Sequence, residues 1–245
     1  MSKIIVITGA GTGLGRALAR RFVAEGETVA LLGRRLSKLE AVAAELGERA
    51  HAIQCDVSSP DSIDAAFGLV KDRHGRVDVL INNAGIFKPF LVAEATVEQI
   101  QQTLATNLAG PIFCARAAIP MIPRGGHIIN VSSETVSHHN YPFLTLYQCS
   151  KAGLEQFSKN LGHELAAQGV RVTAVRAGAM RDEDMAWDLD PAQVARFHQA
   201  ATEAGLNLGG GPTSHFNSLP GIFRAIIDAP DDLITPLVVL GARAS

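Results

Sequence analysis

The stretch "VITGAGTGLGRA", residues 6–17, places an apolar run, a glycine-rich turn and the start of a helix in direct succession. The turn contains four glycines, Gly9, Gly11, Gly13 and Gly15. Glycine allows a tight turn and lets a ligand approach the backbone closely. A helix that begins near Leu14 points its free N–H groups and the positive end of its dipole at the same place. We therefore expect a strand–turn–helix unit that binds an anionic pyrophosphate; the alternative is a glycine-rich turn without a ligand.

The rest of the chain repeats this alternation of apolar runs and helical segments. The predicted strands are residues 3–8, 27–32, 50–55, 77–81, 126–131, 170–175 and 236–240. The predicted helices are residues 14–25, 60–73, 96–108, 112–122, 147–167, 191–204 and 218–228. Runs that are apolar throughout fit a parallel sheet covered on both faces, and the strand–helix order implies right-handed crossovers. We predict an α/β fold: a doubly wound Rossmann sheet of seven parallel strands, order 3-2-1-4-5-6-7, flanked by helices.

Composition excludes several classes of function. The chain has 245 residues, 47% of them hydrophobic, and a formal charge of −2, so it can bury a large core and has no basic surplus for nucleic acid. No run approaches the length of a membrane span or of a signal peptide, so we expect a cytoplasmic protein without a membrane partner. Cys55, Cys114 and Cys149 lack zinc or redox spacing, which predicts free thiols and no metal site.

The end of the second predicted strand indicates the type of dinucleotide. An acidic residue at that position usually binds the adenosine ribose hydroxyls of NAD. Here Gly33 holds the position, and Arg34 and Arg35 follow it. Two guanidinium groups can bind a 2′-phosphate, so NADP(H) is favoured, with Arg34 ahead of Arg35, and NAD(H) stays possible. The alternative is that both arginines only face solvent at a helix start.

Six motifs occur in a family-specific order. They are "TGAGTGLG" at 8–15, "CDVSS" at 55–59, "NNAG" at 82–85, "TNLAG" at 106–110, "INVSS" at 129–133 and "YQCSK" at 147–151. With them the chain resembles the classical short-chain dehydrogenase/reductase (SDR) family, from residue 3 to about 178 and more weakly at the last strand. The resemblance implies a small-molecule oxidoreductase that interconverts a carbonyl and a secondary alcohol by hydride transfer. It also implies a homodimer or homotetramer, paired through helices 96–122 and 147–167.

The same resemblance assigns roles to individual positions. The implied catalytic residues are Asn107, Ser133, Tyr147 and Lys151. The implied cofactor-binding residues are Thr8, Gly9, Gly11, Thr12, Gly13, Leu14, Gly15, Arg34, Arg35, Asp56, Val57, Asn83, Ala84, Gly85, Tyr147, Lys151, Gly178 and Met180. A single domain is expected over residues 1–245, with residues 179–217 as a substrate loop or lid.

The residue types at the implied catalytic positions suit the chemistry. Tyr147 and Lys151 are four residues apart, which puts them on one helix face, one turn from each other. A tyrosine normally titrates near pH ~10, and a close ammonium should lower its pKa toward the range of an acid–base catalyst. Ser133 ends a predicted strand at the carboxyl edge of the sheet, where its hydroxyl can hold the substrate oxygen.

Asn107 carries a further signal. Pro111 lies four residues later and has no N–H, so in a helix the Asn107 carbonyl loses its usual donor and can accept from water. This suits a proton relay that the resemblance implies, in which the main chain of this asparagine holds a water leading to the lysine. The alternative is a plain helix break between 108 and 112, which would also free the carbonyl.

The chain departs from the family pattern in three places. The interval from Ser133 to Tyr147 is 14 residues, one more than usual, which an insertion in the connecting loop accommodates; Ser132 is the alternative hydroxyl. After the sixth strand, Ala177 stands where the family has proline, and Arg176 precedes it, next to the implied cofactor contacts of Gly178 and Met180. The family's signatures are eroded in 181–245, where the usual tetramer interface lies.

Several residues of the later loops have two interpretations each. Tyr141, Phe143 and Leu144 form an apolar pocket wall or a structural plug, and Met185, Trp187 and Phe197 belong to a lid or pack on the body. His138 and His139 line the substrate loop or face solvent. Glu134 selects a polar substrate or points away from the site.

Three other functions compete with an NADP(H)-preferring enzyme. One is an NAD-dependent alcohol or diol dehydrogenase, and another is a catalytically idle dinucleotide-binding sensor or scaffold. The presence of all four catalytic residues argues against the scaffold. A sugar-nucleotide epimerase is disfavoured because it requires TGxxGxxG, whereas position 12 is Thr12.

Overall fold

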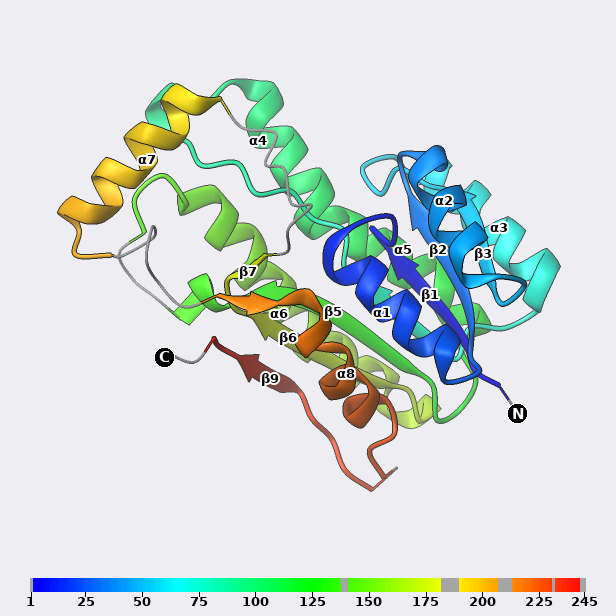
Figure 1. The fold of residues 1–245 in the computed structure, drawn as a ribbon. Coiled ribbons are helices and arrows are strands. Elements are labelled where there is room, and N and C mark those ends of the chain that lie inside the picture. Colours follow the sequence, from blue (N-terminus) through cyan, green and yellow to red (C-terminus); the bar gives the residue numbers. More distant parts are fainter. Residues whose placement is uncertain (1, 138–140, 182–189, 207–212, 231, 243–245) are drawn as a thin grey trace.

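A computed structural model describes residues 2–137, 141–181, 190–206, 213–230 and 232–242. One parallel sheet of seven strands forms its centre (Figure 1). The strands are β1 (Ile4–Thr8), β2 (Thr28–Gly33), β3 (Ala50–Gln54), β4 (Val79–Asn82), β5 (His127–Ser133), β6 (Arg171–Ala177) and β9 (Leu237–Leu240). Their order is β3-β2-β1-β4-β5-β6-β9, which confirms the predicted fold class and strand order, with β9 as the seventh strand.

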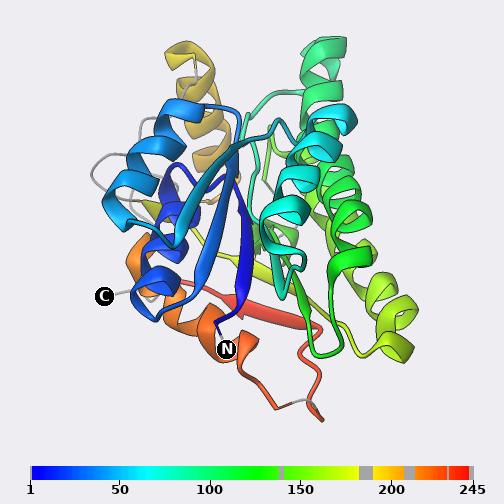
Figure 2. The same ribbon diagram turned by 90° about the vertical axis from the view of Figure 1, so that its right-hand side faces the viewer.

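Helices cover both faces of the sheet (Figure 2). One face carries α1 (Gly13–Ala24), α2 (Leu36–Leu46) and α8 (Pro220–Ile227). The other carries α3 (Pro60–His74), α4 (Val97–Leu104), α5 (Gly110–Ala118) and α6 (Thr145–Leu165). A further helix, α7 (Pro191–Glu203), stands apart from both layers, beyond the carboxyl ends of the strands (Figure 1).

The burial of β1 explains why its sequence is apolar throughout. Ile5, Val6 and Ile7 are all completely buried, so side chains on both faces of the strand meet helices. Burial of one such side chain contributes about 1.5–3 kcal/mol relative to exposure. The apolar side chains of α1, with Phe22 and Leu18 fully buried, supply one of the covering surfaces.

Two elements differ from the predicted ones. The helix α2 is absent from the predicted segments, although Leu36, Leu39 and Val42 recur at a three-residue interval and the latter two are buried. The segment around Asn107 is a continuous helix: α4 runs through a π-helical turn, Ala105–Ala109, into α5. The alternative of a plain helix break at 108–112 is therefore wrong.

The segment predicted as a lid contains ordered elements. Two short parallel strands, β7 (Met180–Arg181) and β8 (Ser214–His215), pair with each other before and after α7. The predictions for Met185, Trp187, His138 and His139 concern positions outside the described residues. Among the described residues, no helix has the length and apolar character to cross a membrane.

The strand order locates the site. β1 pairs with β2 on one side and β4 on the other, so the chain builds outward in one direction from β1 and later in the opposite direction. In open α/β sheets, ligands bind at the carboxyl ends of the strands where this reversal occurs.

Candidate active site

The glycine turn is tied to the end of β4. The Thr8 hydroxyl accepts hydrogen bonds from the backbone N–H groups of Asn83 and Ala84, both at 3.0 Å. In return the Asn83 side-chain amide donates to the Thr8 carbonyl at 2.9 Å. Thr8 is almost fully buried, so it supports the turn from beneath.

Glycine is required at several turn positions for different reasons. Gly9 and Gly13 have φ of +68° and +53°, a conformation that other residues rarely adopt. A Cβ on Gly15 would lie 2.3 Å from the carbonyl oxygen of Gly9. The absence of this Cβ therefore lets α1 begin directly against the end of β1. A Cβ on Gly13 would lie 3.3 Å from the ring of Phe216, which follows β8 and packs on this turn.

A cleft of about 230 Å³ opens between the ends of β1, β2 and β4. Its lining residues are Gly9, Gly11, Thr12, Gly33, Arg34, Arg35, Lys38, Leu39, Cys55, Asp56, Val57, Asn83, Ala84, Gly85, Ile86 and Thr106. Most residues predicted to hold the adenosine side are among them. Leu14 is a buried core residue. Asp56 Oδ1 accepts hydrogen bonds from the Ser58 N–H and hydroxyl, so this oxygen stabilises its own loop.

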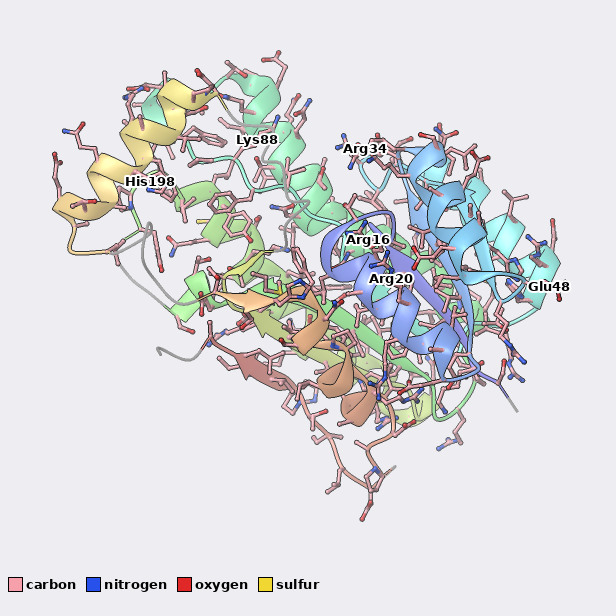
Figure 3. The ribbon with its side chains drawn as sticks, in the orientation of Figure 1. Arg16, Arg20, Arg34, Glu48, Lys88 and His198 are labelled. Atoms are coloured by element: carbon pink, nitrogen blue, oxygen red, sulfur yellow. The ribbon has the colours of Figure 1, made fainter. Side chains whose placement is uncertain are left out.

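Three cations border this cleft. Arg34, Arg35 and Lys38 are exposed, and within the described part of the chain none of them forms an ion pair. Figure 3 shows the Arg34 side chain extending into solvent beyond the end of β2. The backbone carbonyl of Arg34 accepts from the Gln54 side chain at 3.1 Å, which steadies the loop that carries the guanidinium. Lys38 was not a predicted site residue; its position in the first turn of α2 becomes informative only once that helix is recognised.

The predicted catalytic residues converge at the end of β5. Tyr147 and Lys151 lie in α6, and Ser133 is the last residue of β5. The Ser133 side chain lies beside the Tyr147 phenol, close enough to lower the pKa of that phenol, despite the longer connecting loop. The Ser133 oxygen also accepts from the hydroxyl and the N–H of Thr135, at 3.0 and 3.3 Å. These donors occupy its lone pairs and leave its own proton free to donate to another group. Thr135 was not predicted, since its role depends on the short helix that follows β5.

The pKa of Tyr147 differs from expectation. Burial raises it above the ordinary value, and the Ser133 hydrogen bond offsets only part of this effect. The expected lowering by Lys151 is not found, because the Lys151 ammonium donates to the Val131 carbonyl at 2.8 Å. Burial also lowers the pKa of Lys151 to about 8. The prediction of an activated tyrosine is therefore wrong for this arrangement of the lysine.

Asn107 lies fully buried inside the π-helical turn. Its side chain accepts from the Ile86 N–H at 2.8 Å and donates to the Ile86 carbonyl at 2.9 Å, so it holds the loop after β4. A Cβ on Gly85 would lie 3.4 Å from both Asn107 Oδ1 and Lys151 Nζ. These three residues therefore meet at one point. π-helical turns often occur at functional sites, and Pro111 supplies no N–H to the Asn107 carbonyl.

The space on the Cβ side of Gly178, just after β6, is filled by other residues of the protein. A Cβ on Gly178 would lie 2.8 Å from the Leu240 carbonyl and 2.9 Å from Glu134 Oε2. The missing Cβ of Gly178 therefore makes room for Glu134, and its role as a cofactor-binding residue stays a prediction. Glu134 accepts from the Ala179 N–H at 2.9 Å, so its role is to hold this loop. Met180 lies in β7, paired with Ser214.

An aromatic cluster lies beside Tyr147. Phe143, Leu144 and Phe197 are buried together, with Tyr141 and Phe87 packed around them. The Phe87 ring meets the Tyr147 ring edge-on, with centroids 5.1 Å apart. Phe197 comes from α7, so this helix does pack on the body. Arg196 of the same helix forms a bidentate ion pair with Glu94, with both hydrogen bonds at 2.8 Å.

Comparison with known proteins agrees with this geometry. A family model described as short chain dehydrogenase matches residues 3–193. The chain belongs to the short chain dehydrogenase family. It is accordingly an oxidoreductase that acts on CH–OH groups.

Individual members of the short chain dehydrogenase family cover most of the chain. Serine 3-dehydrogenase of Agrobacterium fabrum is 40% identical over 187 residues, which span 75% of this chain and 74% of that protein. The structure of a short-chain dehydrogenase from Streptomyces avermitilis matches with a TM-score of 0.86 at 30% identity, covering 98% of this chain and 88% of the other. A blue fluorescent protein from a metagenomic library, in complex with NADPH, matches with a TM-score of 0.82 at 28% identity, covering 98% and 95%.

Proposed function

We propose that this short chain dehydrogenase is an NADP(H)-preferring oxidoreductase that interconverts a carbonyl compound and a secondary alcohol, with Tyr147 as the acid–base. The observation that carries the proposal is the convergence of the Ser133 and Tyr147 hydroxyls, with Lys151 one helical turn behind them. The pair lies beside a cleft whose far end is bordered by three cations without carboxylate partners among the described residues.

The cleft fits a phosphorylated dinucleotide. The positive φ of Gly9 and Gly13 supports a turn at the N-terminus of α1, where N–H groups favour a pyrophosphate. Arg34, Arg35 and Lys38 would hold a 2′-phosphate, and no carboxylate follows β2 to repel it. The solved NADPH complex of the metagenomic relative supports the same choice. When bound, the nicotinamide would supply or accept the hydride.

Side chains of the protein would transfer the proton. Ser133 would donate to the substrate oxygen, since Thr135 occupies its lone pairs. Tyr147 would give a proton to that oxygen in reduction and take it in oxidation. The raised pKa of Tyr147 keeps it protonated, which suits it to donate. For the reverse direction, the Lys151 side chain would turn from Val131 toward Tyr147 and stabilise the phenolate.

A panel of carbonyl and alcohol substrates, each tested with NADPH, NADH and their oxidised forms, tests the proposal. We expect at least one pair to change the absorbance of the reduced nicotinamide, with NADPH preferred. Tight cofactor binding with no turnover across a wide panel would favour the idle scaffold. Equal efficiency with both cofactors would remove the assigned preference.

A further inference from the structure

An ion pair joins Arg176 of β6 to Glu155 of α6, the two elements beside the Ser133 and Tyr147 hydroxyls (the hydroxyl pair). Arg176 binds Glu155 through two hydrogen bonds of 2.8 and 2.7 Å, and both side chains are largely buried, at 22% and 13% exposure. Arg176 is the residue that precedes Ala177, at one of the departures from the family pattern.

The first connection from this pair leads to β5 and α6. The Ser132 hydroxyl donates to Glu155 Oε1 at 2.7 Å and contacts the Lys151 carbonyl at 3.4 Å. Ser132 is therefore not the alternative catalytic hydroxyl, because it faces α6. Two residues earlier on the same strand face, Asn130 donates to Ser158 of α6 at 2.8 Å. Ser132 and Asn130 are two residues apart on β5, and their partners Glu155 and Ser158 are three residues apart on α6. The two hydrogen bonds therefore form a row between the strand and the helix.

This row of polar bonds sets the position of α6 along β5. Apolar packing is not directional and allows a helix to slide on a sheet at low cost. Buried polar groups need their partners, so a slide of α6 would leave Ser132, Glu155 and Arg176 unsatisfied at about 1–3 kcal/mol each. Tyr147 and Lys151 belong to the same rigid helix, so the row also sets their distance from Ser133.

The second connection leads to Ser133 from the other side. Arg176 Nη1 donates to the Ser137 hydroxyl at 2.9 Å. Ser137 ends the short helix Glu134–Ser137, and Thr135 in that helix donates to Ser133. A single guanidinium thus contacts both the segment that orients Ser133 and the helix that carries Tyr147.

We propose that Arg176 and Glu155 are positioning residues that align Tyr147 with Ser133 through Ser132 and Ser137. The proposal rests on the proposed function for its kinetic consequence. Its spectroscopic consequence depends only on the position of Ser133 beside the Tyr147 phenol. Misplacement of a reacting group by about 1 Å can cost on the order of a hundredfold in rate.

Three variants separate positioning from general stability. Arg176→Met removes the guanidinium, and Glu155→Gln removes the carboxylate charge. Glu27→Gln is the matched control, because Glu27 forms a similarly buried ion pair with Arg224, at 2.8 Å, far from the hydroxyl pair. All three are compared at a temperature where circular dichroism shows each to be fully folded.

The first readout is kinetic. We expect kcat to fall by about tenfold in Arg176→Met and less in Glu155→Gln, with the cofactor Kd unchanged within about twofold. Glu27→Gln should lower the melting temperature without changing kcat. A kcat in Arg176→Met equal to that of the control would reduce the pair to a structural role and overturn the proposal.

The second readout needs no substrate. The chain has two tyrosines, so Tyr141→Phe leaves Tyr147 as the only phenol to titrate by near-ultraviolet absorbance. The elements around it carry Ser133 at the end of β5 and Glu134 just after it, Lys151 and Glu155 on its own helix, and Arg176 on β6. Loss of alignment weakens the Ser133 hydrogen bond, so the Tyr147 pKa should rise in both Arg176→Met and Glu155→Gln.

Charge effects alone predict a different pattern. Removing Arg176 would raise the Tyr147 pKa, whereas removing the Glu155 charge would lower it. Shifts of opposite sign, or no shift, would therefore overturn positioning. If no substrate of the panel turns over but both pKa values rise, the proposed function fails while the positioning role stands.

Discussion

The two halves of the site treat charge in opposite ways. At the adenosine end, Arg34, Arg35 and Lys38 are exposed and, within the described ranges, have no carboxylate partners. At the catalytic end the described arginines are neutralised, Arg176 by Glu155 and Arg196 by Glu94. Charge left without a protein partner marks a place for an anionic ligand, whereas paired charge holds elements together. The adenosine end is therefore suited to bind an anionic ligand, and the paired charges of the catalytic end hold its elements in alignment.

The halves also differ in what they are built from. The binding half is built from glycine and other backbone positions at the ends of β1, β2, β3 and β4, with three cationic side chains at its border. The catalytic half brings side chains from α4–α5, β5, β6 and α6 to one point. Substitutions in the two halves should therefore fail differently, by lost binding in one and lost turnover in the other.

The largest expected effect is that of Tyr147→Phe. General acid–base groups contribute about 10²–10⁴-fold, so kcat should fall by on the order of a thousandfold. The cofactor Kd should stay unchanged, because the ring still packs against Phe87. Steady-state kinetics and a fluorescence titration with NADPH measure the two quantities. Retained turnover would remove Tyr147 from the mechanism.

Gly15→Ala should damage the binding half. Its Cβ would lie 2.3 Å from a backbone oxygen that cannot move independently, so the variant should lose about 1–3 kcal/mol of stability and much of its cofactor affinity. Chemical denaturation and cofactor titration measure these losses. Gly68→Ala is the control, since its Cβ meets nothing within 4 Å and a helical alanine should be neutral or stabilising.

Arg34→Ala and Lys38→Ala should separate the two cofactors. Hydrogen bonds to charged groups are worth about 1.5–3 kcal/mol, so NADPH affinity should weaken by roughly 10–100-fold for Arg34 and less for Lys38. NADH affinity should not change. Arg116→Ala provides a comparison, because Arg116 pairs with Asp64 away from the cleft. Equal losses for NADPH and NADH would contradict the 2′-phosphate assignment.

Lys151→Met should stabilise the fold while removing activity. Burial lowers the folded pKa of Lys151 to about 8 from 10.5, so below pH 8 the folded state carries the full cost of the buried charge. The variant should therefore gain about 1–3 kcal/mol at neutral pH, reduced by the lost bond to Val131.

The sign of this effect can be checked by pH. As the pH rises from about 8 through 10.5, the folded protein releases its proton first and the wild type regains stability. The gap between Lys151→Met and wild type in denaturant unfolding should narrow over this range. A gap that stays constant would show that the charge of Lys151 is not the cause.

The sequence predicted the local units well. The glycine turn, the Tyr147–Lys151 spacing and the start of α3 at Pro60 depend on residues close in the chain, so their patterns are visible without a structure. The helix α2, and with it Lys38, was missed, although Leu36, Leu39 and Val42 recur at a regular interval that indicates a helix. These features follow from backbone geometry and periodicity, which act over a few residues.

The tertiary structure decided what the side chains do. Lys151 lies one turn from Tyr147, as its spacing requires, yet its ammonium bonds to Val131 on β5. Gly178 accommodates Glu134 and Leu240, which are distant in sequence. Arg176 looked like a departure from a pattern, and only the packing of β6 against α6 reveals Glu155 as its partner. Local conformation is set by neighbours along the chain, but the pairing of buried polar groups depends on which surfaces meet in the folded molecule.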